Sequence, residues 1–320
     1  MPLGAATTLE LLTVGRVSVD LYPEQIGVPL SQVRTFRKML GGSPTNVAVA
    51  AARLGRRAGV ITKVGDDPFG PYVREALTGF GVDPSRVGSD PSLRTPIVFC
   101  EIFPPDRFPL LFYREPKAPD MNLLPDDVDL DEVARVPLFW TTGTGLSDEP
   151  SRSTTLAALR ARTGGITVHD LDYRPMFWAS EEDARRLGRE ALAHATVAVG
   201  NLTEVAVVVG DLSPDEAADA LLELGVELAV VKLGHEGVLA RSLDQRCSVL
   251  PIAIEVVNGL GAGDAFGGAL CHGLLSGWDL ERTIRFANAA GALVAGRLGC
   301  ADDMPTLDEI EALLAATAAA

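Results

Sequence analysis

The segment from 256 to 266 contains the residues of this chain that are best suited to chemistry on an anion. Gly261, Ala262 and Gly263 are small enough for the backbone to turn tightly and bring its N–H groups close to a ligand. A helical apolar pattern follows, and the start of a helix offers unpaired N–H donors and partial positive charge to a phosphate. Asp264 would lie in the first turn, where its carboxylate could accept the proton of an attacking hydroxyl. The alternative is an ordinary helix that begins after a glycine turn.

A second glycine-rich segment precedes another predicted helix. Ser43 is typical of a helix N-cap and Pro44 of the first helical position. This capping pattern accounts for neither the glycine pair, Gly41 and Gly42, nor Asn46. We expect the glycines to let a polyol approach the backbone closely, and Asn46 to offer its amide group to hydroxyls.

Two further motifs follow predicted strands. Asn201 and Glu204 have the spacing of a capping box, which needs no ligand. Alternatively, Glu204 lies near a water molecule bound to Mg²⁺, an ion that prefers carboxylates and retained waters. Lys232 is followed by Gly234 and Gly237, a spacing that predicts either the floor of a nucleotide site or a plain β-turn.

The remaining sequence alternates short apolar segments with Ala- and Leu-rich helical patterns. Strands that are apolar throughout are typical of a parallel sheet covered by helices on both faces, so we expect an α/β, doubly wound fold. No linker or repeat divides the chain, which predicts one domain over 1–320. The predicted strands are 9–14, 59–64, 138–142, 166–170, 197–200 and 228–233, and the predicted helices are 44–54, 71–80, 151–162, 181–193, 214–224, 262–276 and 280–298.

Two segments, 16–39 and 95–114, interrupt this alternation. Both combine turn residues with short extended runs, which predicts a small β-sheet. Open α/β sheets bind ligands beyond the carboxyl ends of their strands, so we expect the small sheet to form a lid there. Ordinary surface decoration is the alternative.

The composition narrows the class of protein. Of the 320 residues, 47% are hydrophobic and 22% are charged, which is enough apolar material for a large core. The 28 basic and 43 acidic residues give a net charge of −15, which argues against a nucleic-acid partner. Four scattered cysteines favour reduced thiols, and neither a signal peptide nor a long apolar run is evident. We therefore expect a cytoplasmic protein without a membrane partner.

Taken in order along the whole chain, these motifs resemble those of the ribokinase-like (PfkB) carbohydrate kinases. The resemblance implies a ribokinase-like fold, ATP and Mg²⁺, a β-sheet lid, and a homodimer formed through that lid. It also implies that Asp264 is the catalytic base, and that the amides around Gly261, Ala262 and Gly263 stabilise the transferred phosphoryl group.

The same resemblance assigns residues to the two substrates. It implies that Asp20, Gly41, Gly42 and Asn46 bind the hydroxyls of the carbohydrate, and that Glu204 holds Mg²⁺ through water. The residues expected near the nucleotide are Asn201, Lys232, Gly234, Gly237 and Asn288.

One position departs from the family pattern. Asn258 stands where the family usually has an aspartate that is associated with a monovalent cation. The substitution removes a charge from that position, so the sequence leaves activation by potassium open.

Two arginines point to an acidic substrate. Arg114 ends the second lid segment and Arg174 follows a predicted core strand. Arginine binds a carboxylate bidentately, which a neutral sugar would not require. Both segments resemble the sugar-acid branch of the family, although either arginine could instead form a structural ion pair.

Segments 15–21, 143–152 and 172–178 resemble the branch that acts on 5-dehydro-2-deoxygluconate in myo-inositol degradation. We therefore expect ATP-dependent phosphorylation of the terminal primary hydroxyl of this keto-deoxy sugar acid. The alternatives are 2-keto-3-deoxygluconate or a fructose-like sugar as acceptor. A different class, a non-catalytic nucleotide or sugar sensor, would be expected to lack Asp264 or the glycine turn, and this chain keeps both.

Overall fold

The computed structural model describes residues 8–318. Within that range ten strands form a central sheet in the order β14-β13-β12-β11-β10-β9-β1-β4-β5, with β6 also paired to β4. The strands from β5 to β12 in this order are parallel, whereas β13 and β14 add an antiparallel edge. The strands are β1 (Leu11–Val14), β4 (Ala58–Gly65), β5 (Val82–Asp83), β6 (Val87–Asp90), β9 (Leu138–Thr142), β10 (Ile166–Asp170), β11 (Val197–Asn201), β12 (Leu228–Lys232), β13 (Val238–Ser242) and β14 (Arg246–Val249).

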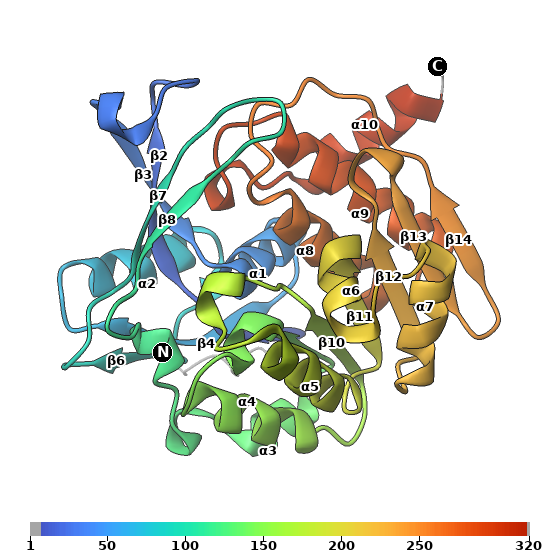
Figure 1. Ribbon diagram of the computed structural model, residues 1–320, viewed down its shortest axis with the longest axis horizontal. Helices are drawn as coiled ribbons and strands as arrows, with labels where there is room; N and C mark the ends of the chain where they lie inside the picture. Colours follow the sequence, from blue (N-terminus) through green and yellow to red (C-terminus); the bar gives the residue numbers. More distant parts are fainter. Residues whose placement is uncertain (1–7, 319–320) are drawn as a thin grey trace, which may run out of the picture.

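Helices cover both faces of this sheet (Figure 1). Neighbouring strand residues point to opposite faces: Leu11 packs in the cluster that contains α1 and α8, and Leu12 packs in the cluster that contains α4. The α/β, doubly wound architecture with a mostly parallel sheet is thus confirmed. The helices are α1 (Ser43–Arg53), α2 (Phe69–Gly79), α3 (Leu130–Arg135), α4 (Ser151–Arg160), α5 (Glu181–Leu192), α6 (Leu202–Val209), α7 (Pro214–Glu223), α8 (Ala262–Leu275), α9 (Leu280–Ala295) and α10 (Leu307–Ala318).

The two segments that interrupt the alternation form a separate four-stranded sheet, in the order β3-β2-β7-β8. This small sheet stands away from the helical layers at the upper left of Figure 1. Its pairing is mixed, because β2 is antiparallel to β3 but parallel to β7. Its strands are β2 (Ser18–Pro23), β3 (Phe36–Gly41), β7 (Ile97–Cys100) and β8 (Leu110–Tyr113).

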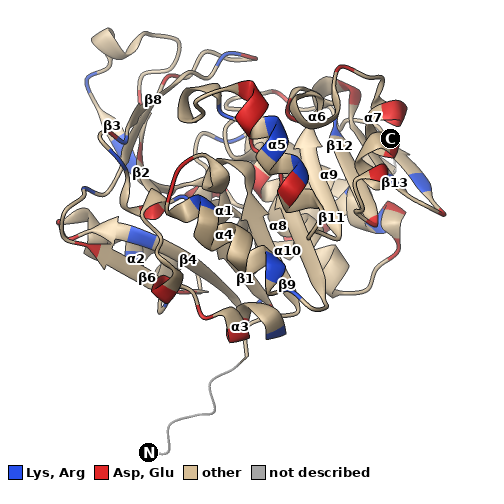
Figure 2. Cartoon of the chain, turned by 60° about the horizontal axis from the view of Figure 1, so that its bottom comes forward, with Lys and Arg blue, Asp and Glu red and all other residues tan. Residues whose placement is uncertain are grey.

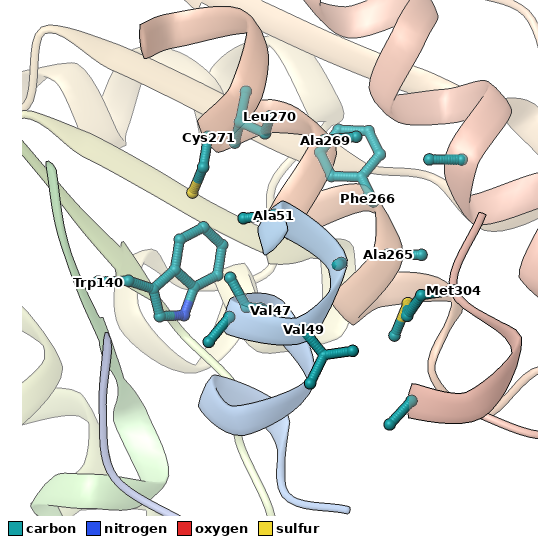
Figure 3. Close-up of a cluster of buried hydrophobic side chains, with 14 of the residues drawn as sticks. Val47, Val49, Ala51, Trp140, Ala265, Phe266, Ala269, Leu270, Cys271 and Met304 are labelled. Atoms are coloured by element: carbon teal, nitrogen blue, oxygen red, sulfur yellow. The ribbon is translucent and has the colours of Figure 1, made fainter. Parts of the chain in front are cut away.

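Helices α1 and α8 pack against each other unusually closely (Figure 3). A side chain at Gly268 would overlap Ala50, and one at Gly267 would lie 2.7 Å from the ring of Trp140. The helices approach this closely because α8 presents hydrogen atoms there rather than methyl groups. As a result, the first residues of both helices lie side by side.

The sequence prediction is wrong in a few details. Gly42, not Ser43, is the residue that precedes α1, and no side chain caps this helix. The predicted helix over 280–298 ends at Ala295, and the short helices α3 and α6 were not predicted. The antiparallel edge of β13 and β14 was also missed.

The positions of acidic residues match the dipoles of several helices. Acidic residues gather in the first turns of α3, α5 and α7, where they complement the helix dipole (Figure 2). All four cysteines are free, as expected. Among the helices of residues 8–318, none is both long and apolar enough to cross a membrane.

Candidate active site

A cavity of about 270 Å³ lies between the small sheet and the edge of the central sheet at which the parallel strands end. This is the position at which open α/β sheets bind ligands. The ends of the core strands, the starts of α1 and α8, and the inner face of β2 all contribute to its wall. Its polar and charged lining consists of Arg16, Ser18, Asp20, Tyr22, Ser43, Asn46, Asp170, Asp172, Arg174, Asn201, Glu204, Lys232, Asp264 and Cys300.

The carboxylate of Asp264 lies in the first turn of α8 and is held by two residues of α1. Ser43 Oγ donates a hydrogen bond to Oδ1 of Asp264 (2.7 Å), and Asn46 Nδ2 donates one to Oδ2 (2.8 Å). The packing of α1 on α8 therefore fixes the direction of this carboxylate in the cavity. Ser43, which the sequence predicts to be a helix cap, instead positions the acidic residue.

The surroundings of Asp264 shift its protonation in opposite directions. Burial raises the pKa of Asp264, whereas the hydrogen bonds from Asn46 and Ser43 lower it, and the balance lies above the ordinary value. Cys300 Sγ lies 3.8 Å from Oδ2 of Asp264, and burial raises the pKa of this thiol well above its usual range. The thiol therefore stays neutral, and Asp264 is a carboxylate of increased basicity, as suits a general base.

The turn before α8 has the geometry that an anion site requires. Gly261 has a left-handed φ of +83°, and a side chain there would overlap Cys300. Gly259, Gly261 and Gly263 all line the cavity, so their backbones are accessible to a ligand at the start of a fourteen-residue helix. Ala262 does not line the cavity, and its predicted part in anion binding stays a prediction.

Of the residues expected to bind carbohydrate hydroxyls, Asp20, Gly42 and Asn46 line the cavity, whereas Gly41 does not. Asn46 is 4% exposed, and its Oδ1 has no hydrogen-bond partner among the described residues. A buried acceptor without a donor is costly, and a ligand hydroxyl would supply the missing donor. Gly42 lines the same wall, and side chains at Gly41 and Gly42 would overlap Asp20 and the carbonyl of Arg16 respectively.

Asp20 lies on β2, whose alternate residues Ser18, Asp20 and Tyr22 face the cavity. Ser18 Oγ donates to Asp20 Oδ1 (2.6 Å). Burial raises the pKa of Asp20 to about 6, although Ser18 and the charge of Arg16 act against this shift. A carboxylate of this kind can accept hydrogen bonds from substrate hydroxyls at neutral pH.

Two arginines share the carboxylate of Asp172. Arg16 Nη2 lies 2.7 Å from Oδ2 of Asp172, and Arg174 Nη2 lies 3.2 Å from Oδ1. Burial acts against ionisation, but the charges of Arg16 and Arg174 hold the pKa of Asp172 well below its usual range. Arg174 is therefore in the cavity as predicted, together with Arg16, which the sequence analysis did not assign.

Arg114 lies elsewhere. Its Nη1 is 3.1 Å from Oδ2 of Asp120, and its Nη2 binds Oδ1 of the same fully buried carboxylate. Arg114 lines a neighbouring cavity of about 550 Å³ rather than the one that contains Asp264. Arg114 thus forms a structural ion pair, which was the alternative to binding of the substrate carboxylate.

Asn201 and Glu204 form the capping box that their spacing allows. Asn201 Oδ1 accepts from the N–H of Glu204 (2.9 Å), and Glu204 Oε2 accepts from the N–H of Asn201 (2.8 Å). Glu204 Oε1 lies 3.4 Å from Nη1 of Arg174. Both residues still line the cavity, so the capping box and a ligand role are compatible.

Lys232 ends β12 and reaches the same cavity close to the glycine turn, since a side chain on Gly263 would lie 3.4 Å from its Nζ. Burial would lower the pKa of Lys232, but the negative charges of Asp170 and Glu204 outweigh this effect and raise it. Burial also raises the pKa of Asp170, partly offset by Lys232. Lys232 is thus a charged ammonium group beside the glycine turn.

Three residues expected near the nucleotide lie outside the cavity. Gly234 belongs to the short turn between β12 and β13, and a side chain at Gly237 would overlap the carbonyl of Val249. The turn geometry accounts for both glycines. Asn288 is on α9, where its Nδ2 donates to the carbonyl of Leu250 (3.0 Å). Their contact with a nucleotide stays a prediction.

Comparisons with known proteins identify the family and the fold. The model of the pfkB family of carbohydrate kinases matches residues 8–307. A 5-dehydro-2-deoxygluconokinase from Clostridium perfringens is 33% identical over 94% of this chain and 91% of its own. An E. coli structure described as ribokinase II in complex with ATP and Mg²⁺ has a TM-score of 0.87 and 26% identity, with 96% of this chain and 99% of that chain covered. A fructokinase double mutant from Vibrio cholerae O395, with fructose, ADP and potassium bound, has a TM-score of 0.84 and 27% identity over 97% of this chain and 100% of that one. The fold is therefore ribokinase-like, and the chain belongs to the pfkB family of carbohydrate kinases.

Proposed function

We propose that this protein transfers the γ-phosphoryl group of ATP to the terminal primary hydroxyl of a keto-deoxy sugar acid. The first candidate is 5-dehydro-2-deoxy-D-gluconate, converted to its 6-phosphate in myo-inositol degradation. The single observation that carries the proposal is the Asp264 carboxylate, which faces the cavity at the start of α8 with Ser43 and Asn46 bonded to its two oxygens.

Asp264 is positioned to act as the general base. As the hydroxyl oxygen of the acceptor attacks the γ-phosphorus, its proton passes to the Asp264 carboxylate and the bond from phosphorus to the ADP oxygen breaks. Asn46 and Asp20 would hold neighbouring hydroxyls, which fixes the direction of attack.

The charge that develops on the phosphoryl oxygens would be stabilised from the other side. The N–H groups at the start of α8 and the ammonium group of Lys232 line the same part of the cavity. Fixed donors in a partly water-excluded site stabilise such charge more strongly than water does. The small sheet over the cavity would act as a lid that limits hydrolysis of ATP by water.

The donor set fits Mg²⁺ held mainly by phosphates and water. Among residues 8–318 no cluster of three metal-ligating side chains is present, but Glu204 lines the cavity with Oε2 engaged in the cap and Oε1 only 3.4 Å from Arg174. Magnesium usually keeps several waters and takes one or two carboxylates, so Glu204 would hold it through water. When bound, the ion neutralises charge on the transferred phosphoryl group.

Potassium does not fit at Asn258. This side chain is fully buried, its Nδ2 donates to the carbonyl of Leu298 (2.7 Å), and its Oδ1 accepts from the N–H of Leu260 (3.0 Å). Asn258 thus brings an amide donor and no negative charge to this position. We therefore propose a kinase that needs no monovalent cation at this position.

Two features support an acid as the acceptor. Arg16 and Arg174 place two guanidinium groups in the cavity that contains Asp264. A relative with 33% identity over nearly the whole chain is named a 5-dehydro-2-deoxygluconokinase. The second candidate acceptor is 2-keto-3-deoxygluconate, which also joins a carboxylate to a distant primary hydroxyl.

A substrate panel tests this proposal. ADP formation would be measured with 5-dehydro-2-deoxygluconate, 2-keto-3-deoxygluconate, fructose and no acceptor. We expect the highest kcat/KM with the first and little ADP without an acceptor. A higher kcat/KM with fructose would refute the acid specificity, and ADP formation that ignores the acceptor would refute the kinase assignment.

Two further parts of the proposal concern assembly and compartment. A homodimer through the small sheet is supported by β8, an edge strand on which Leu111 and Tyr113 are 48% and 61% exposed. A reducing, cytoplasmic compartment is supported by four free cysteines. Size measurement in solution, with a charged substitution at Leu111 that should yield monomers, tests the first.

A further inference from the structure

Arg16 lies at an unusual place for an arginine. It follows the end of β1, an interior strand of the central sheet, and is only 6% exposed. A buried guanidinium group is unfavourable unless it is paired, and Arg16 is paired by Asp172 and by Thr144 Oγ1, which accepts from Nε at 2.9 Å. The fold therefore supports this charge with two dedicated partners at the wall of the active-site cavity.

These partners do not use all of the donors of Arg16. Its Nε and Nη2 are engaged, but within residues 8–318 no hydrogen bond engages Nη1. The face of the group is packed by the ring of Phe177, 5.5 Å from the guanidinium carbon. Arg16 is thus fixed in direction, with N–H groups left to bind a ligand.

Two carboxylates pair with the two guanidinium groups at this position. Asp172 is a single carboxylate between two guanidinium groups, and Thr144 Oγ1 also donates to it at 2.7 Å. The second negative partner, Glu204, lies 3.4 Å from Arg174 and is already bonded through its other oxygen. Asp172 and Glu204 thus balance the two guanidinium charges, so an anion would bind here through the N–H donors that these carboxylates leave unbonded, in a cavity whose other walls carry Asp20, Asp170 and Asp264.

Arg114 provides an internal contrast. Its guanidinium carbon also lies over Phe177, at 5.4 Å, on the side of the neighbouring cavity. However, both of its terminal nitrogens bind Asp120, which also accepts from the N–H of Val17 (2.9 Å). Both arginines thus lie over one aromatic ring, but of the two only Arg16 lines the cavity that contains Asp264.

We propose that Arg16 binds the carboxylate of the acceptor together with Arg174, and that Arg16 is the residue that selects an acid over a neutral sugar. This inference rests on the proposed function. Arg16 takes the place that the sequence prediction gave to Arg114. Asp172 acts as a positioning residue that holds the two guanidinium groups at the spacing of one ligand carboxylate.

The test is a comparison of Arg16→Gln with Arg114→Gln, the control arginine that also lies over Phe177 but lines the neighbouring cavity. Calorimetry would measure binding of 5-dehydro-2-deoxygluconate in the presence of ADP and, separately, binding of ADP alone. We expect Arg16→Gln to raise the Kd for the acid by about 10- to 100-fold, the loss of a charged hydrogen bond, and to leave the Kd for ADP unchanged. Arg114→Gln should leave both Kd values close to those of the wild type.

Other results would contradict the inference or the proposed substrate. Unchanged binding of the acid by Arg16→Gln, or a selective loss in Arg114→Gln, would overturn the inference while leaving the kinase assignment intact. Wild-type protein that binds ADP but no keto-deoxy acid would refute the proposed substrate and the inference with it. If Arg16→Gln does not fold, Arg16→Lys provides the test, because it keeps the charge but loses the bidentate fork, and a Kd for the acid equal to that of the wild type would overturn the inference.

Discussion

The two ends of the active-site cavity are built in different ways. The proposed phosphoryl end comes mainly from one continuous segment, Gly259 to Asp264, whose turn and helix start provide the N–H donors and the carboxylate, with Lys232 beside it. The acid end is assembled from Arg16, Asp172 and Arg174, which follow β1 and β10 and meet only because these strands lie close together in a parallel sheet.

The two ends would therefore have different tasks: phosphoryl transfer at one end and selection of the acceptor at the other. The phosphoryl end would use backbone groups, the Asp264 carboxylate and the Lys232 ammonium group, so substitution of either side chain should impair transfer itself. The acid end uses side chains held by one another, so substitutions there can change the acceptor and leave the chemistry in place. Helix α1 connects the ends, because Ser43 and Asn46 bind Asp264 on α8 and Thr45 Oγ1 donates to the carbonyl of Arg16 (2.9 Å).

Asp264→Asn should have the largest effect, at the phosphoryl end. The amide keeps the shape of the side chain but cannot accept the proton, so we expect kcat to fall by about 10³-fold or more with ATP binding retained. Rapid-quench measurement of acid phosphorylation, together with nucleotide calorimetry, checks both statements. A kcat within tenfold of the wild type would exclude Asp264 as the base.

Gly41→Ala should have the second largest effect, on kcat/KM for the acceptor. The new methyl group would overlap the carboxylate of Asp20, so this carboxylate must move, and we expect kcat/KM for the acceptor to fall by about 10²-fold. The Kd for ADP should not change. Gly79→Ala is the matched control, since a methyl group there meets no atom within 4 Å and should leave kcat/KM unaltered.

Ser43→Ala should change the pH dependence of kcat/KM. The hydrogen bond from Ser43 lowers the pKa of Asp264, so its removal should raise that pKa further. The base must be ionised to act, and activity is lost as the pH falls through its pKa. The acid limb of the kcat/KM profile should therefore move to higher pH, with a smaller loss on the alkaline side. An unmoved limb would argue against Ser43 as a positioning residue.

Replacement of potassium by sodium should have the smallest effect. Because Asn258 donates to the carbonyl of Leu298, we expect kcat to change by less than about twofold, within the range of general salt effects. Strong activation by potassium alone would show that a cation site exists despite this amide.

The sequence predicts the continuous parts of the site better than the assembled parts. Asp264 and the glycine turn lie in one segment with a helical pattern behind it, so short-range rules predict their place. Ser43 looks like a cap, and only the packing of α1 on α8 shows that its hydroxyl reaches Asp264. The glycines at 267 and 268 were the available signal, since small residues on a helix allow close packing.

The choice between Arg16 and Arg114 could not be made from spacing. Each lies beside a strand near the cavity. Which guanidinium group can bind a ligand depends on whether a buried carboxylate such as Asp120 already pairs with it. Such pairing joins residues far apart in the chain or separated by an irregular turn. The fold class, by contrast, follows from strands that are apolar throughout and alternate with helices.

The most direct test of the account is to determine where the phosphate is attached in the product formed from 5-dehydro-2-deoxygluconate and ATP. If the carboxylate binds at the arginine corner while the far hydroxyl meets Asp264, nuclear magnetic resonance should find phosphorus coupled only to the terminal carbon opposite the carboxylate. Phosphate on the carboxylate, on an inner carbon, or on no acid at all would contradict the account.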